Sequence, residues 1–303
     1  MVRVKTPLES WIAQKVTGRR DEPLTMEKLR AYQLQKLQET LDYVRERSPF
    51  YRRHLQKYLS KADYSLTKLE DMAGLPFTTQ EDIRRYGQEM ICVKADEIHR
   101  IVTLQSSGTT GRPKRVYFTE EDQELTMDFF HHGMLTLVKP GDRVMILLPG
   151  STPGSVGDLL RNGLARAGVE GIIHGPVTDP YDTLKQLYSS RCNSLVGIPT
   201  QVLTLARVQK KDGLPKPFLT NLLLTTDHVP QSIVQELVQT WACTVFNHYG
   251  MTEMGLGGGI DCQGFQGYHL REGDLYFEIV HPVTGEPVPQ GQYGEIVFTT
   301  LTR

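Results

Sequence analysis

The stretch LQSSGTTGRPK, from Leu104 to Lys114, decides how the rest of this chain is interpreted. It combines hydroxyl side chains with glycines and ends in a cation, and its candidate phosphate-binding residues are Ser106, Ser107, Gly108, Thr109, Thr110, Gly111 and Lys114. Glycines let backbone N–H groups approach anionic oxygens, and hydroxyls add further donors. Apolar runs at residues 101–104 and 116–118 predict a strand on each side. The composition therefore suits a triphosphate, and a Ser/Gly/Thr surface turn is the plainer alternative.

A second stretch, NHYGMTE at residues 247–253, follows an apolar run that predicts a strand. It brings together an aromatic ring, a glycine, a hydroxyl and a carboxylate; its candidate residues are Asn247, His248, Tyr249, Gly250, Thr252 and Glu253. Such a set can stack on a base and reach a metal-bound phosphate. Taken alone, so short a motif also fits a turn with a buried tyrosine.

Strand-like and helix-like segments alternate from residue 143 to residue 246. This rhythm predicts a largely parallel sheet flanked by helices, an α/β fold. Ligands of such sheets bind beyond the carboxyl ends of the strands. The loops at residues 149–157, 225–230 and 247–253 are expected at that edge.

The two ends of the chain differ from this middle part. Apolar residues at three- and four-residue steps predict a helix over residues 26–47, capped by Thr25 and ended by Ser48-Pro49. Strand runs at residues 274–280 and 294–300 predict antiparallel β structure. The expected organisation is a helical segment (1–95), an α/β nucleotide-binding core (96–260) and a β-rich subdomain (261–303).

Composition excludes several classes of protein. The chain has 303 residues and a formal net charge of -1, which gives no bias toward nucleic acid or anionic membranes. The longest apolar runs, such as residues 144–148, are too short to span a bilayer. The 4 cysteines form no C-x-x-C pair, so a disulfide framework is not expected. These features predict a cytoplasmic protein.

The two stretches resemble, in the same order along the chain, the phosphate loop and the Tyr-Gly-x-[Ser/Thr]-Glu motif of the adenylate-forming enzymes. Within that superfamily the chain is most similar to phenylacetate-CoA ligases. The resemblance implies that Tyr249 stacks on adenine, that Thr252 contacts the α-phosphate and that Glu253 ligates Mg²⁺. It also implies that the phosphate loop with Lys114 holds the β- and γ-phosphates. Lys114, Thr252 and Glu253 would then be the catalytic residues.

The activity implied by this resemblance is ATP-dependent conversion of a carboxylic acid, aryl or arylacetic, to an acyl-adenylate, followed by thioesterification to coenzyme A. An adenylyl transferase acting on a cofactor hydroxyl and a nucleotide-binding module without catalysis are the alternatives. The implied partners are the small-molecule acid and a C-terminal domain, and a homodimer is allowed. The chain lacks the later Thr-Gly-Asp-type motif and the C-terminal lysine of these enzymes, so only their large N-terminal domain is expected.

Two details depart from the family pattern or extend it. Asp227 and His228 occupy the loop that cups adenine, where glycine is common, and an Asp-turn explains them equally well. Cys262 and His269 resemble a zinc-like pair in some members of the group. A structural zinc site takes four ligands, so this pair alone is an incomplete set.

Overall fold

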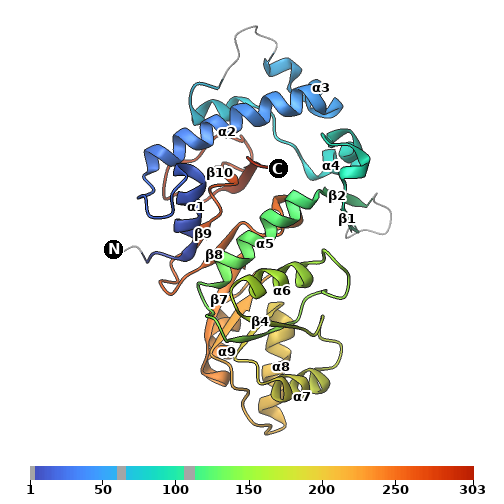
Figure 1. The fold of residues 1–303 in the computed structure, drawn as a ribbon, viewed down its shortest axis with the longest axis vertical. Coiled ribbons are helices and arrows are strands. Elements are labelled where there is room, and N and C mark those ends of the chain that lie inside the picture. Colours follow the sequence, from blue (N-terminus) through green and yellow to red (C-terminus); the bar gives the residue numbers. More distant parts are fainter. Residues whose placement is uncertain (1–3, 60–65, 106–112) are drawn as a thin grey trace. The chain divides into compact units, whose positions relative to one another are not determined.

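The computed structural model describes residues 4–59, 66–105 and 113–303 (Figure 1). The chain divides into two compact units. The first unit combines Met1–Trp11 with Gln123–Arg271, and the second combines Ile12–Asp122 with Glu272–Arg303. These boundaries differ from the three consecutive segments expected from the sequence, because each unit is assembled from stretches that are far apart along the chain.

The first unit is built on a seven-stranded sheet with the order β4-β3-β5-β6-β7-β8-β9. The strands are β3 (Arg143–Ile146), β4 (Glu170–Ile173), β5 (Ser194–Gly197), β6 (Asn221–Leu224), β7 (Thr244–Tyr249), β8 (Gly259–Asp261) and β9 (Tyr268–Leu270). Strands β3 to β7 are parallel, whereas β8 and β9 extend the sheet in antiparallel pairing. The parallel sheet expected from the alternating segments is confirmed.

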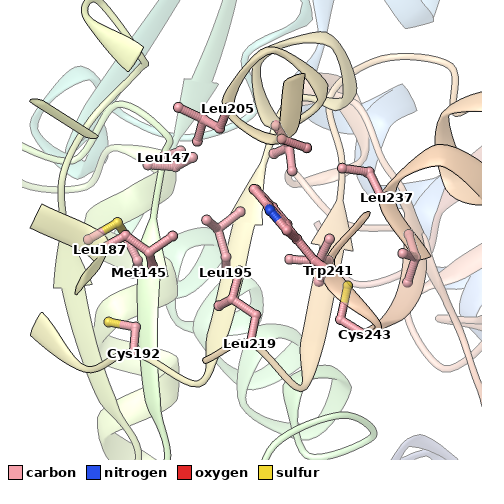
Figure 2. Packing of buried hydrophobic residues seen from close by; sticks show 14 of the residues in the cluster. Met145, Leu147, Leu187, Cys192, Leu195, Leu205, Leu219, Leu237, Trp241 and Cys243 are labelled. Atoms are coloured by element: carbon pink, nitrogen blue, oxygen red, sulfur yellow. The ribbon is translucent and has the colours of Figure 1, made fainter. Parts of the chain in front are cut away.

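Helices flank this sheet, and their bounds are α5 (Glu120–Met134), α6 (Val156–Arg166), α7 (Pro180–Ser190), α8 (Pro199–Lys211) and α9 (Gln231–Trp241). Alternate strand residues point to the same face, so Met145 and Leu147 of the β3 region join one core. Leu205 of α8 and Trp241 of α9 cover that core from the helical side (Figure 2). Burying each large apolar side chain contributes about 1.5–3 kcal/mol.

The second unit carries most of α1 (Pro7–Thr17) and several further helices. These are α2 (Met26–Arg47), α3 (Pro49–Leu59), α4 (Gln80–Tyr86) and the 3₁₀ helices η1 (Leu69–Gly74), η2 (Gly87–Met90) and η3 (Ala95–Glu97). Two antiparallel hairpins complete it: β1 (Arg100–Leu104) with β2 (Lys114–Phe118), and β10 (Leu275–Val280) with β11 (Glu295–Thr300). Its core brings Leu37 of α2 against Leu69, Met72 and Leu301.

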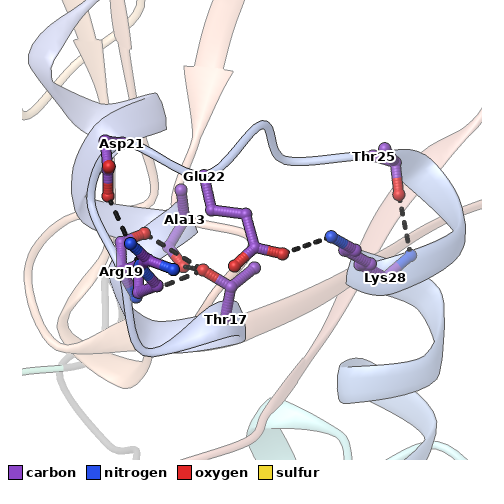
Figure 3. A network of polar contacts seen from close by, with 7 residues as sticks. All are labelled: Ala13, Thr17, Arg19, Asp21, Glu22, Thr25 and Lys28. Atoms are coloured by element: carbon purple, nitrogen blue, oxygen red, sulfur yellow. Dashed lines mark hydrogen bonds and ion pairs between the residues drawn. The ribbon is translucent and has the colours of Figure 1, made fainter.

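The connection between α1 and α2 is held by polar contacts (Figure 3). The Thr17 hydroxyl donates to the Ala13 carbonyl at 2.8 Å, and Lys28 forms an ion pair with Glu22. The Lys28 backbone N–H donates to the Thr25 hydroxyl at 3.2 Å, which confirms Thr25 as the N-cap of α2. Helix α2 has the bounds predicted for it, whereas α1 is not predicted by the sequence pattern.

Capping boxes begin two further helices, α4 of the second unit and α5, most of which belongs to the first unit. Asp82 accepts from the Thr79 backbone N–H at 2.8 Å and donates its own N–H to the Thr79 hydroxyl at 3.1 Å. Thr119 and Asp122 exchange the same pair of bonds at 2.8 and 3.1 Å. In each box Asp takes the place of the usual Glu or Gln. Over the three described ranges, no helix is both long enough and apolar enough to cross a membrane.

Candidate functional site

The candidate site of the first unit lies at the carboxyl ends of its parallel strands. Residues 149–157 follow β3, residues 225–230 follow β6 and residues 250–253 follow β7, as the sequence predicts. One expectation is corrected: the NHYGMTE stretch does not begin after a strand, because Asn247–Tyr249 belong to β7. The reason is the antiparallel strand β8, which pairs with His248 and Tyr249 and prolongs the ladder.

Tyr249 is the last residue of β7 and remains partly exposed. Its ring centroid lies 5.8 Å from that of Tyr268 on β9, with the planes tilted by 38°. Burial raises the pKa of the Tyr249 hydroxyl above its ordinary value, so the ring stays neutral at physiological pH. A neutral aromatic ring of this kind can stack on a purine base.

The turn after Tyr249 is packed too tightly to accept larger residues. A Cβ at Gly250 would lie 2.5 Å from the Leu256 carbonyl oxygen, and a Cβ at Gly257 would lie 2.2 Å from a ring carbon of Phe129. The Thr126 hydroxyl of α5 donates to the Gly255 carbonyl at 3.0 Å. These contacts hold the 3₁₀ helix η4 (Thr252–Met254), which presents Thr252 and Glu253 as partly exposed residues.

His248 points away from Tyr249, because successive strand residues face opposite sides. Its Nδ1 shares a hydrogen bond of 2.7 Å with the Thr225 hydroxyl. Its Nε2 is enclosed and has no hydrogen-bond partner within the described ranges. Burial lowers the pKa of His248 to about 4, so the imidazole is neutral at physiological pH.

Asp227 and His228 are both exposed in the loop after β6. The Asp227 carboxylate accepts from the backbone N–H of the next residue, His228, at 2.7 Å, whereas the bond of an Asp-turn goes to the residue two positions on. Just before them, Thr226 has φ of 73°, a left-handed conformation that β-branched residues rarely adopt. Contact of Asp227 or His228 with a base stays a prediction.

Two residues of this edge carry no sequence signal that would have singled them out. Asp261 of β8 accepts from the Asn247 backbone N–H at 3.0 Å, and burial raises the pKa of its carboxyl group. Thr225 binds His248 from the neighbouring strand end. Both roles depend on strand pairing, so spacing along the chain does not reveal them.

The phosphate-loop residues belong to the second unit. Lys114 opens β2, pairs in register with Leu104 of β1 and is 8% exposed. The loop residues themselves lie outside the described residues: Ser106, Ser107, Gly108, Thr109, Thr110 and Gly111. That Lys114 and Glu253 act on one nucleotide therefore stays a prediction.

The candidate zinc ligands have other contacts. The Cys262 thiol is buried and accepts from the Gly264 backbone N–H at 3.3 Å, while His269 pairs with Glu9. Within residues 4–59, 66–105 and 113–303, no group of three or more His, Cys, Asp or Glu side chains is arranged to hold a metal. Zinc at Cys262 and His269 stays a prediction that needs further ligands.

Comparison with known proteins adds an independent finding. A family model described as AMP-binding enzyme matches residues 26–301. The phenylacetate-coenzyme A ligases of Thermus thermophilus and Pseudomonas putida are 31% and 30% identical to the chain over 294 residues. Each match covers 93% of the chain, which spans 64% of the length of these relatives.

Solved structures show the same fold. The structure of 2-hydroxyisobutyryl-CoA ligase in an open conformation, in complex with 2-HIB-AMP and CoA, superposes with a TM-score of 0.82 at 22% identity. The superposition covers 94% of the chain and 64% of that protein. A long-chain-fatty-acid-CoA ligase from Archaeoglobus fulgidus matches over 70% of the chain and 44% of its own, with a TM-score of 0.56 at 16% identity.

Proposed function

The chain belongs to the AMP-binding enzyme family, and from that premise we propose that it activates a carboxylic acid with ATP to form an acyl-adenylate. The observation that carries the proposal is the position of Tyr249, Thr252 and Glu253. They lie at the carboxyl end of β7, on a turn fixed by close contacts with α5, where ligands of parallel sheets bind.

In the proposed reaction the substrate carboxylate attacks the α-phosphorus of ATP. A bond forms between the acid oxygen and that phosphorus, and the bond to the bridging oxygen of pyrophosphate breaks. Tyr249 stacks on the base and the Thr252 hydroxyl donates to the α-phosphate. Lys114 and the hydroxyls of the phosphate loop bind the β- and γ-phosphates. Their contribution is positioning and charge neutralisation, which dominate phosphoryl-transfer catalysis.

The residues present fit one Mg²⁺ ion held with the nucleotide. Magnesium is ordinarily bound by one or two carboxylates together with substrate phosphates and waters. Glu253 is a single, partly exposed carboxylate on the turn after β7, which meets that requirement without a dedicated metal cluster. When bound, the ion would neutralise charge on the triphosphate.

We further propose that the acyl group passes from the adenylate to the thiol of coenzyme A, with release of AMP. The support is the similarity to the two phenylacetate-coenzyme A ligases, which also makes an aryl or arylacetic acid the proposed substrate. Coenzyme A and the acid are thus the proposed small-molecule partners. Free thiols at all four cysteines suit a reducing compartment, and we place the protein in the cytoplasm.

The decisive experiment is acid-dependent exchange of labelled pyrophosphate into ATP. The chain is assayed with Mg²⁺ and a panel of aryl and alkyl acids, alone and with a C-terminal domain of a relative added in trans. Exchange that depends on the acid supports the proposal, and Glu253→Gln is expected to reduce it at least tenfold. MgATP binding without exchange, even with the added domain, would instead favour a non-catalytic nucleotide-binding module. Transfer of AMP to a cofactor hydroxyl would appear in product analysis as a different adduct.

A further inference from the structure

A side-chain hydrogen bond joins two of the loops at the candidate site. Thr225 directly follows β6, is 6% exposed and donates its backbone N–H to the Gly197 carbonyl at 3.1 Å. Its hydroxyl lies 2.7 Å from His248 Nδ1 on β7. Strands β6 and β7 are paired neighbours, so this bond ties their carboxyl ends together beyond the last backbone pair.

The His248 ring is confined on its other sides. Its centroid lies 5.9 Å from that of Phe129 and 6.4 Å from that of Phe130, both on α5. A Cβ at Gly250 would come within 2.8 Å of His248 Cε1. Thr225 is the only hydrogen-bond partner of this ring that the described part of the chain provides. The imidazole therefore has one orientation, set by Thr225 and the aromatic rings.

The residue after Thr225 holds an unfavourable backbone conformation. Thr226 has φ of 73°, although it is β-branched. Conformations of this kind persist only where neighbouring contacts fix them, and they gather at ligand-binding sites. The fixed point next to Thr226 is the bond between Thr225 and His248. It is therefore placed to hold the strained loop that carries Asp227.

We infer that Thr225 and His248 form a positioning pair for nucleotide binding, an inference that rests on the proposed function. His248 does not touch the nucleotide in this scheme. It acts through Tyr249, its neighbour on β7, and through the loop at residues 225–230. Loss of the bond lets the Tyr249 ring and this loop shift independently. This weakens ATP binding more than it lowers the rate at which the bound complex reacts.

The test compares variants of Thr225 in acid-dependent pyrophosphate exchange and in direct titration with MgATP. Thr225→Val keeps the side-chain shape and removes the hydroxyl, whereas Thr225→Ser retains it. Thr183→Val is the matched control, because Thr183 is also buried and its hydroxyl donates to the Asp179 carbonyl at 2.8 Å, at the N-cap of α7. His248→Phe removes the same bond while keeping an aromatic ring, and it serves if the valine variant does not fold.

Thr225→Val and His248→Phe are expected to raise the KM and the Kd for ATP about tenfold, the effect of one lost hydrogen bond, with kcat changed less than threefold. Thr225→Ser and Thr183→Val should keep the wild-type KM. An unchanged KM in both bond-deleting variants, or an equal rise in Thr183→Val, overturns the positioning role while leaving the proposed function intact. A wild-type chain that neither binds ATP nor exchanges pyrophosphate overturns both.

Discussion

Gly250 shows how one residue without a side chain sets the geometry of the candidate site. The atom nearest to a Cβ at this position is a backbone oxygen, that of Leu256 at 2.5 Å, which cannot move aside as a flexible side chain can. We predict that Gly250→Ala destabilises the fold by about 1–3 kcal/mol through overpacking. Urea unfolding measures the change.

The control for this prediction is Gly74→Ala in η1, where no heavy atom lies within 4 Å of an added Cβ. Its stability should stay within about 0.5 kcal/mol of the wild type. Equal stability of both alanine variants would show that the turn after β7 is looser than its contacts indicate.

The imidazole of His248, whose Nε2 is enclosed, predicts a pH dependence of stability. The pKa of His248 is about 4 in the folded chain, whereas an unperturbed histidine, as in the unfolded chain, has a pKa of 6.5. The unfolded chain therefore binds the proton more readily. The contribution of this group to the free energy of unfolding should therefore be fully present above pH 6.5 and decrease as the pH falls from 6.5 to 4. The total decrease should reach about 3 kcal/mol. His248→Phe should remove this component, which shows as a flatter curve of unfolding free energy against pH. Parallel curves for the two proteins would contradict the assignment.

Thr226 predicts a stabilising substitution. Its φ of 73° costs a β-branched residue about 1–3 kcal/mol, whereas glycine adopts this region freely. Thr226→Gly should therefore raise the melting temperature. The gain is reduced by the larger conformational entropy of glycine in the unfolded chain, which favours unfolding. Calorimetry decides, and a lowered melting temperature would mean that the threonine side chain makes contacts that outweigh the strain.

Helix α2 is the element whose bounds follow most directly from local sequence. The Thr25 hydroxyl accepts from the Lys28 backbone N–H, and Ser48-Pro49 ends the helix. Thr25→Ala is predicted to cost about 1 kcal/mol of stability, whereas Thr25→Ser keeps the acceptor. Chemical unfolding of both variants measures the difference, and an equal loss in the serine variant would point to the methyl group instead of the cap.

Strand β7 shows where such local reasoning stops. Apolar residues indicate a strand that ends at Phe246, yet β7 continues to Tyr249 because β8 pairs with it. Two hydrogen bonds to residues of other strands or strand ends support this polar end of β7. Asp261 accepts from the Asn247 N–H, and Thr225 binds His248. The hydrophobic pattern of the β7 segment predicts neither of these partners, because both lie elsewhere in the chain.

For the molecule as a whole, the sequence predicts that Lys114 and Glu253 serve one ATP molecule. Lys114→Ala and Glu253→Gln should each reduce pyrophosphate exchange strongly, and the double variant should lose less than the product of the two single losses. Groups that act on one transition state are non-additive in this way. Fully multiplicative losses would indicate two independent sites.

The sequence by itself determined the features that depend on near neighbours: the caps and bounds of α2, the alternation that makes a parallel sheet, and the two motifs that identify the family. The tertiary structure alone decided contacts between distant residues. Thr225 and His248 are 23 positions apart, and the buried Asp274 pairs with Lys15 from 259 positions away. Helix α1 likewise forms where Leu8 and Trp11 become buried. Such bonds form only after strands pair and helices dock, because hydrogen bonding and burial act through space and leave no fixed spacing along the chain.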